Sequence, residues 1–336
     1  MNLIETCKLK IKENPKRVVF PDSTDERVLK AARYLADEGL AVPVLIGGPF
    51  EIRDLADQYR ISTKGINIFS PAQYPDIKSF ASTFYELRKH KGMTSEEAEK
   101  LISDPVNFAA MLVRKNAADI CIAGNLSTTA NVLKAAIQII GMPDGIKTVS
   151  SFFLMISPDG NTIYSFSDCA VIPEPTSEQL VDIAYSSAVN YKSITCNIPR
   201  TALLSFSTKG SADHPSTEKI KNAVKMLSSK FPDMIFDGEL QLDAALVPEV
   251  GKKKAPDSRI KGDANVFVFP SLEAGNIGYK IAERFGNYLA LGPFIQGLQK
   301  QMHDLSRGCS WQDIVNTTVI ASCIENSKLN HLLFHN

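Results

Sequence analysis

The sequence has no long apolar run and no excess of charge of either sign. Its 336 residues include 37 Lys and Arg and 37 Asp and Glu, so the formal net charge is zero. A neutral chain has no general attraction for nucleic acid or anionic lipid, and a membrane span needs about 20 consecutive apolar residues. We therefore expect no nucleic-acid partner and no membrane partner, and any anion site has to come from local groups.

The six cysteines are far apart and form no CxxC pair. In a chain long enough to fold without disulfides, this pattern indicates reduced thiols and a cytoplasmic protein, and it argues against a zinc site. The apolar spacing of residues 3–11 is typical of an amphipathic helix and lacks the apolar core of a signal peptide.

Three common catalytic signatures are also missing. The sequence has no G-x-x-x-x-G-K-[ST] loop, no G-x-G-x-x-G after a predicted strand and no G-x-S-x-G elbow. Their absence disfavours nucleotide hydrolysis, a standard dinucleotide site and a serine hydrolase.

Apolar patterning predicts a regular alternation of strands and helices. Short apolar runs at 17–20 and 42–46 flank a helical pattern, and the same order recurs at 118–123 with a helix at about 127–140, and at 201–206 with a helix from about 216. Such alternation indicates α/β architecture with largely parallel sheets covered by helices. A chain of this length exceeds what one hydrophobic core usually organises, so we expect two α/β domains.

The segment Gly141–Gly145 breaks the alternation and predicts a domain boundary. Beyond it, runs at 149–156 and 162–166 around a polar turn predict an antiparallel hairpin, and residues 291–293 suggest where the chain crosses back. The expected first domain is 1–143 plus 295–336, and the second is 144–294.

The segment Leu305–Asp313 holds a hydroxyl, a guanidinium and a carboxylate at a loop-to-helix junction. Acyl transfer from a phosphate needs a cation for the phosphate, a donor for the developing oxyanion and a base for the nucleophile. Arg307, Ser306 and Asp313 suit these roles in that order. These nine residues alone favour a simpler interpretation, in which Ser310 and Asp313 cap the helix that follows.

Three polar loops follow predicted strands and are candidates for anion binding. They are residues 124–129, with hydroxyls and expected free amides at a helix start, residues 207–211 around Lys209, and residues 306–308. Open α/β sheets place ligands at the carboxyl ends of their strands, which favours all three loops together over any one alone.

Several motifs, in order along nearly the whole chain, resemble the phosphate acetyltransferase family, also called phosphotransacetylases. They are Phe20-Pro21-Asp22 followed by Asp25–Leu29, then Ser205–Ser211, Asp237–Gln241, Phe269–Lys280 and Leu305–Ser310, of which the last two are the most specific.

The resemblance implies reversible transfer of an acetyl group between coenzyme A and inorganic phosphate in a ternary complex. It also implies an active-site cleft between the two domains, a C-terminal segment that returns to the first domain, and a homodimer. Coenzyme A or acetyl-CoA and phosphate or acetyl phosphate would be substrates, with no tightly bound cofactor and no metal.

By the same resemblance, Asp313 deprotonates the coenzyme A thiol while Arg307 and Ser306 stabilise the transition state, and Arg88 binds coenzyme A. Two positions depart from the family pattern: Lys134 replaces an arginine and loses the bidentate fork for phosphate, and no histidine precedes Ser127-Thr128. The expected substrate-binding residues are Arg88, Lys134, Ser127, Thr128, Ser207, Thr208, Lys209 and Asn276.

Three alternatives stay open at this point. A phosphate butyryltransferase differs in the size of its acyl pocket, which the sequence does not reveal. An acyltransferase-like domain without activity is disfavoured by the intact Ser306, Arg307 and Asp313, and a metal- or nicotinamide-dependent dehydrogenase by the lack of an acidic metal cluster.

Overall fold

The computed structural model describes residues 3–334, with side chains described as far as residue 327. The described chain forms two compact units, residues 3–143 with 298–334, and residues 144–297. The second unit continues beyond residue 294 because strand β10, Leu289–Gln296, pairs Ile295 with Ser151 and Gln296 with Ser150. The predicted crossing at Leu291–Pro293 is therefore wrong, since these residues lie inside β10 at an irregularity of its register.

The first unit contains a parallel sheet with the strand order β11-β4-β1-β2-β3. Its central strands are almost entirely buried, as expected for parallel strands with helices on both faces. The strands are β1 Lys16–Phe20, β2 Ala41–Ile46, β3 Asn67–Phe69, β4 Ile120–Ala123 and β11 Gln301–Asp304.

Helices of the first unit begin where polar side chains cap them. Asp25 caps α2 by accepting from the Arg27 amide, and Thr94 and Glu97 form a capping box at the start of α5. The helices are α1 Leu3–Lys12, α2 Glu26–Asp37, α3 Pro49–Gln58, α4 Ile77–Arg88, α5 Ser95–Ile102, α6 Pro105–Arg114, α7 Thr129–Ala135 and α13 Trp311–Phe334, with short helical turns at 71–73 and 89–91.

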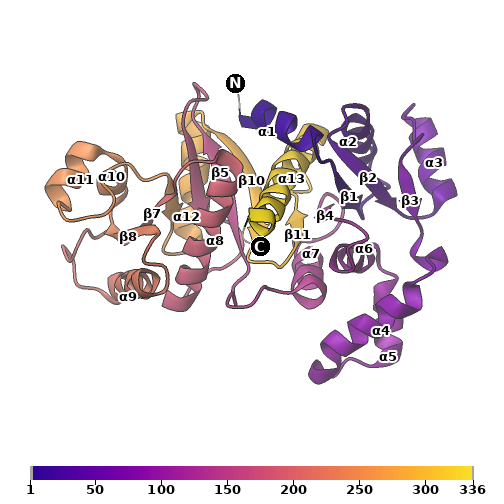
Figure 1. Cartoon of the computed structure of the whole chain (residues 1–336), viewed down its shortest axis with the longest axis horizontal. Coiled ribbons are helices and arrows are strands. Elements are labelled where there is room, and N and C mark those ends of the chain that lie inside the picture. The colour runs from indigo at the N-terminus through magenta and orange to yellow at the C-terminus, as the bar shows by residue number, and fades with distance from the viewer. Residues whose placement is uncertain (1–2, 335–336) are drawn as a thin grey trace. The chain divides into compact units, whose positions relative to one another are not determined.

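Two features of these helices depend on the rest of the unit. The helix predicted for 127–140 begins at Thr129 and changes to a π-helix at Ala136–Ile140. Helix α13 (yellow in Figure 1) lies alongside α1 (indigo), so the last helix of the described chain packs on the first.

The second unit contains a mixed sheet with the order β10-β5-β6-β9-β7-β8. The predicted hairpin is confirmed, because β5 and β6 pair antiparallel, whereas β6, β9, β7 and β8 are parallel. Its strands, besides β10, are β5 Ser150–Ile156, β6 Ile163–Ser167, β7 Arg200–Leu204, β8 Ile235–Leu240 and β9 Val266–Val268.

Two apolar cores cover the two faces of this second sheet. Ala202 and Phe267 belong to one core and their neighbours Leu203 and Val268 to the other, which is the alternation expected of strands buried on both sides. The helices are α8 Ser177–Thr195, α9 Pro215–Lys230, α10 Leu242–Leu246, α11 Pro248–Lys254 and α12 Leu272–Gly286. The predicted α/β class, with largely parallel sheets covered by helices, is confirmed.

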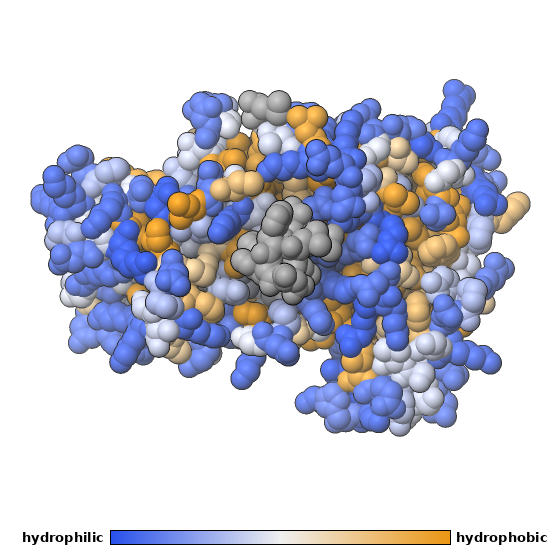
Figure 2. All heavy atoms as spheres, in the orientation of Figure 1, coloured by the Kyte–Doolittle hydropathy of each residue, from blue (hydrophilic) through white to orange (hydrophobic). Residues whose placement is uncertain are grey.

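The described helices include none that is both long and apolar enough to cross a membrane. On the face shown in Figure 2, hydrophilic side chains dominate and apolar side chains occur in small separate groups.

Candidate active site

Three loops of the first unit meet at one edge of its sheet. Strands β1, β4 and β11 are neighbours and parallel, so the segments after Phe20, Ala123 and Asp304 emerge at the same edge. The contact is close: the Leu305 amide donates to the Ala123 carbonyl at 2.7 Å. Gly124 has φ +104°, and a Cβ there would lie 2.3 Å from Asp304 Oδ1, so only glycine fits.

Asp22 organises the loop after β4. Its Oδ2 accepts from the backbone amides of Gly124, Leu126 and Ser127 at 2.9, 3.2 and 3.3 Å, and its Oδ1 accepts from the Ser127 hydroxyl at 2.5 Å. The Thr128 hydroxyl accepts from the Asn131 amide as the cap of α7. The amides expected to be free for an anion are thus occupied by a carboxylate, and the oxygens of Ser127 and Thr128 already hold the loop.

Arg27 joins this loop to the segment after β11. Its guanidinium pairs with Asp25, donates from Nη1 to the carbonyls of Arg307 and Cys309, each at 2.7 Å, and donates from Nη2 to the Asn125 carbonyl at 3.2 Å. Burial acts to raise the pKa of Asp25, but the hydrogen bonds and charge of Arg27 outweigh it and the pKa lies below its usual value. The planar fork of one arginine therefore fixes the backbone of both loops.

Ser306 and Arg307 project from this fixed backbone into solvent, and both residues are exposed. The Ser306 hydroxyl accepts from the Gly308 amide at 3.2 Å and keeps its own proton to donate. Within residues 3–327, the Arg307 guanidinium takes part in no hydrogen bond or ion pair. These two predicted catalytic side chains are therefore available to a substrate.

Asp313 lies in the first turn of α13 and is also exposed. Its Oδ2 accepts from the Ser310 amide at 2.8 Å and from the Ser310 hydroxyl at 2.9 Å, and its own amide donates back to that hydroxyl at 3.2 Å. The predicted capping contacts are confirmed. They occupy only Oδ2, and in the described structure Oδ1 accepts no hydrogen bond, so capping leaves one oxygen for another role.

Asp304, the last residue of β11, is only 5% exposed, and its Oδ1 finds no hydrogen-bond partner in the described part of the chain. Burial raises the pKa of Asp304 to about 6, and the nearby Asp22 carboxylate adds to the increase, while Thr129 and Arg307 act to lower it. A buried acid thus lies directly beneath the Ser306-Arg307 segment.

Arg88 and Lys134 lie on helices of the same unit. Arg88 is the half-buried last residue of α4, and Lys134 is exposed on α7, two turns after Thr128. Neither side chain forms an ion pair or hydrogen bond within the described residues, so both cations are available.

In the second unit, the loop after β7 holds itself together with the side chains predicted to bind substrate. The Ser207 hydroxyl donates to buried Glu239 at 3.0 Å, and the Thr208 hydroxyl accepts from the Gln241 amide at 2.9 Å. Lys209, at φ +49°, pairs with Asp237 and donates to the Gly238 carbonyl at 2.9 Å.

Asn276 of α12 also uses both ends of its amide. Its nitrogen donates to the Cys169 carbonyl at 3.1 Å, and its oxygen accepts from Lys280 at 2.8 Å. One residue earlier, a Cβ on Gly275 would lie 2.2 Å from the Asp168 carbonyl, so this glycine lets α12 approach the chain closely. The motif therefore has a packing function whatever it binds.

The sequence analysis assigned no role to Arg27, Asp22 or Asp304. Arg27 and Asp22 belong to motifs that carry the family resemblance, which was a signal for both. Asp304 immediately precedes the Leu305–Ser310 motif, but its burial follows from the pairing of β11 with β4, and no local pattern reveals that.

Among the described residues, no group of three or more His, Cys, Asp and Glu side chains is placed to hold a metal ion.

Comparison with known proteins identifies the family. The family model described as phosphate acetyl/butaryl transferase matches residues 2–322. The chain belongs to this family.

Named relatives agree with this assignment. A phosphate acetyltransferase of Bacillus subtilis is 44% identical over 321 residues, which cover 96% of this chain and 98% of the relative. A phosphotransacetylase structure from Streptococcus pyogenes matches with a TM-score of 0.92 at 40% identity, covering 96% of this chain and 98% of that one. The EutD phosphotransacetylase from Staphylococcus aureus matches with a TM-score of 0.90 at the same identity and coverage. The predicted phosphate acetyltransferase function is confirmed, and the protein is an acyltransferase. The roles of single residues stay predictions.

Proposed function

We propose that the protein transfers the acetyl group of acetyl phosphate directly to coenzyme A, and back, through the segment Ser306–Asp313. Asp313 Oδ1 takes the thiol proton, the sulfur attacks the acetyl carbonyl carbon, and the bond from that carbon to the phosphate oxygen breaks as phosphate leaves. Arg307 neutralises charge on the phosphate, and the Ser306 hydroxyl donates to the developing oxyanion. The reverse reaction uses the same groups in the opposite order.

The observation that supports this mechanism is the contrast between a fixed backbone and available side chains. Arg27 holds the carbonyls of Arg307 and Cys309, while the Arg307 guanidinium and Asp313 Oδ1 are unoccupied within the described residues. Preorganised groups of this kind stabilise a transition state without reorganising during the reaction.

The test is thioester formation from coenzyme A with acetyl, propionyl and butyryl phosphate, on the unmodified protein and on Arg307→Ala. We expect acetyl transfer to fall by about 10²–10³-fold in the variant. Arg53→Ala is the matched control, because Arg53 is an exposed arginine on α3 outside the three loops, and its rate should not change. A butyryl preference would indicate phosphate butyryltransferase activity, and no turnover with any donor would indicate a domain without catalysis.

We further propose that the protein is a homodimer, with α12 at the contact. Ile277, Ile281 and Phe285 are 56%, 52% and 86% exposed and recur every four residues, so they form an apolar stripe on one face of the helix. Exposed apolar stripes mark interaction surfaces.

Light scattering of Phe285→Glu should give half the mass of the unmodified protein. Phe50→Glu is the control, because Phe50 is 85% exposed on α3, a helix of the first unit. If both variants are dimers, the interface does not include the α12 stripe.

The cytoplasmic location expected from the cysteine pattern also stays a proposal.

A further inference from the structure

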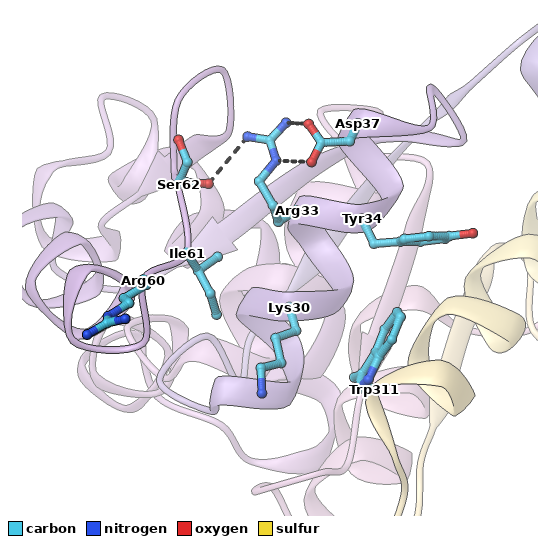
Figure 3. Close-up of a pocket in the computed structure, with 8 residues that line it drawn as sticks. All are labelled: Lys30, Arg33, Tyr34, Asp37, Arg60, Ile61, Ser62 and Trp311. Atoms are coloured by element: carbon cyan, nitrogen blue, oxygen red, sulfur yellow. Dashed lines mark hydrogen bonds and ion pairs between the residues drawn. The ribbon is translucent and has the colours of Figure 1, made fainter.

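A groove of about 600 Å³ lies over one face of α2, between the loop after α3 and the first residue of α13 (Figure 3). Its volume falls in the range of sites for small organic ligands. Three cationic residues, Lys30, Arg33 and Arg60, line it against one acidic residue, Asp37. Because the whole chain is neutral, this is a local excess of positive charge.

The three cations differ in what already occupies them. Arg33 is bidentate to Asp37 and donates to the Ser62 and Lys64 carbonyls at 3.3 and 2.7 Å, so it ties the loop after α3 to α2. Lys30 pairs only with Glu26 on the exposed helix surface, a weak type of ion pair. Arg60 takes part in no ion pair or hydrogen bond with any residue that the structure describes.

The other end of the groove is aromatic. Trp311, the first residue of α13, meets Tyr34 of α2 edge to face, with ring centroids 5.5 Å apart. The indole is half-exposed, and Figure 3 shows Lys30 between Trp311 on one side and Arg60 on the other. A ligand that fills the groove therefore meets a flat apolar surface at one end and cations at the other.

We propose that the α2 groove binds a nucleoside phosphate, with the base against Trp311 and the phosphates between Lys30 and Arg60. Nucleobases of any sequence stack on aromatic side chains, and arginine binds phosphate through two parallel hydrogen bonds. The ligand is either a free nucleotide or the nucleotide end of coenzyme A. Trp311 belongs to the segment proposed for acyl transfer, but Arg307 does not line the groove. Nucleotide binding is measured without turnover, so the proposal does not depend on the proposed acyl transfer.

Trp311 is the only tryptophan of the chain, so its fluorescence reports on the groove directly. We expect ADP to change this fluorescence saturably, and adenosine or inorganic phosphate alone to bind at least tenfold more weakly. Arg60→Asn should weaken ADP at least tenfold, and asparagine is chosen because Arg60 has φ +57°, a conformation that asparagine tolerates. Lys30→Gln should weaken ADP to a smaller extent.

Two control variants test whether nucleotide binding is independent of Arg307. Arg53→Ala and Arg307→Ala should both bind ADP as the unmodified protein does, whether or not Arg307→Ala is inactive. No saturable change at about 1 mM ADP, or equal affinity in Arg60→Asn and the unmodified protein, would overturn the proposal.

Competition between coenzyme A and ADP shows whether the groove binds coenzyme A or a free nucleotide. If coenzyme A displaces ADP, and Arg60→Asn raises the KM for coenzyme A about tenfold without changing kcat, the groove receives the nucleotide end of the substrate. If neither occurs while ADP still binds, the ligand is a free nucleotide.

Discussion

The loop at 305–313 in the first unit and the loop at 205–211 in the second have similar composition but opposite construction. In the first, Arg27 holds the backbone, and Ser306 and Arg307 project into solvent. In the second, Ser207 and Lys209 bond to Glu239 and Asp237 and hold the loop themselves. In these two loops, similar side chains are therefore available in one, where Arg27 fixes the backbone, and already bonded in the other, where they fix it themselves.

Among variants of the two loops, Asp313→Asn in the first loop is expected to reduce activity most. An amide still accepts the Ser310 bonds but cannot take a thiol proton, so kcat should fall by about 10²–10⁴-fold with little change in Tm. The measurement is steady-state kinetics beside a thermal melt.

Glu97→Gln is the control, because Glu97 caps α5 as Asp313 caps α13. It should leave turnover unchanged. If Asp313→Asn turns over at nearly the rate of the unmodified protein, Asp313 is not the base and only caps α13.

Arg27→Lys should release the backbone of the first loop and so remove its difference from the second. Lysine keeps the charge but loses the fork that spans Asp25, Asn125 and the carbonyls after Ser306. We expect kcat/KM to fall by about 10–100-fold, because small displacements of catalytic groups are costly, together with a lower Tm. An active Arg27→Lys protein would show that the fork does not position Arg307.

Asp304→Asn tests whether the buried carboxylate at the start of the first loop destabilises the native state. The variant should have a larger free energy of unfolding at neutral pH. Because burial raises the pKa of Asp304 to about 6, the native state binds this proton more tightly than the unfolded chain. The resulting stabilisation is complete below the ordinary aspartate pKa near 4 and is lost as the pH rises through about 6.

At pH 7.5 the asparagine variant should therefore be more stable by about 1–3 kcal/mol, and near pH 4 the difference should almost vanish. Denaturant unfolding at the two pH values measures both. An equal increase in the free energy of unfolding at both pH values would show that the charge of Asp304 is not the cause.

Lys209→Met is expected to give the smallest effect. It tests whether Lys209 stabilises the second loop or binds a substrate. It leaves Asp237, whose side chain is 9% exposed, without its cation, so the free energy of unfolding should fall by about 1–2 kcal/mol with the KM for phosphate unchanged.

Lys221→Met, which breaks the exposed pair with Glu218, should cost less than about 0.5 kcal/mol. A tenfold higher KM in Lys209→Met at unchanged stability would instead make Lys209 a substrate ligand.

Local patterns predicted most of the architecture because each element carries its own signal. The strand at 17–20, the hairpin at 149–156 and 162–166 and the helix from about 216 have apolar periods, turns and caps that act within a few residues. The extent of β10 was missed because Gly292 and Pro293 normally end a strand, and here pairing with β5 keeps them inside one.

The family, the α/β class and the polar residues that are candidates for catalytic roles all follow from the amino-acid sequence, because motifs and periodicity are local properties. Which of those side chains remain available depends on contacts that form only in the folded protein. Asp22 occupies the amides of the 124–127 loop and Arg27 occupies the carbonyls of the 307–309 loop. Both contacts join residues about a hundred or more positions apart, and strand order, not spacing along the chain, brings them together.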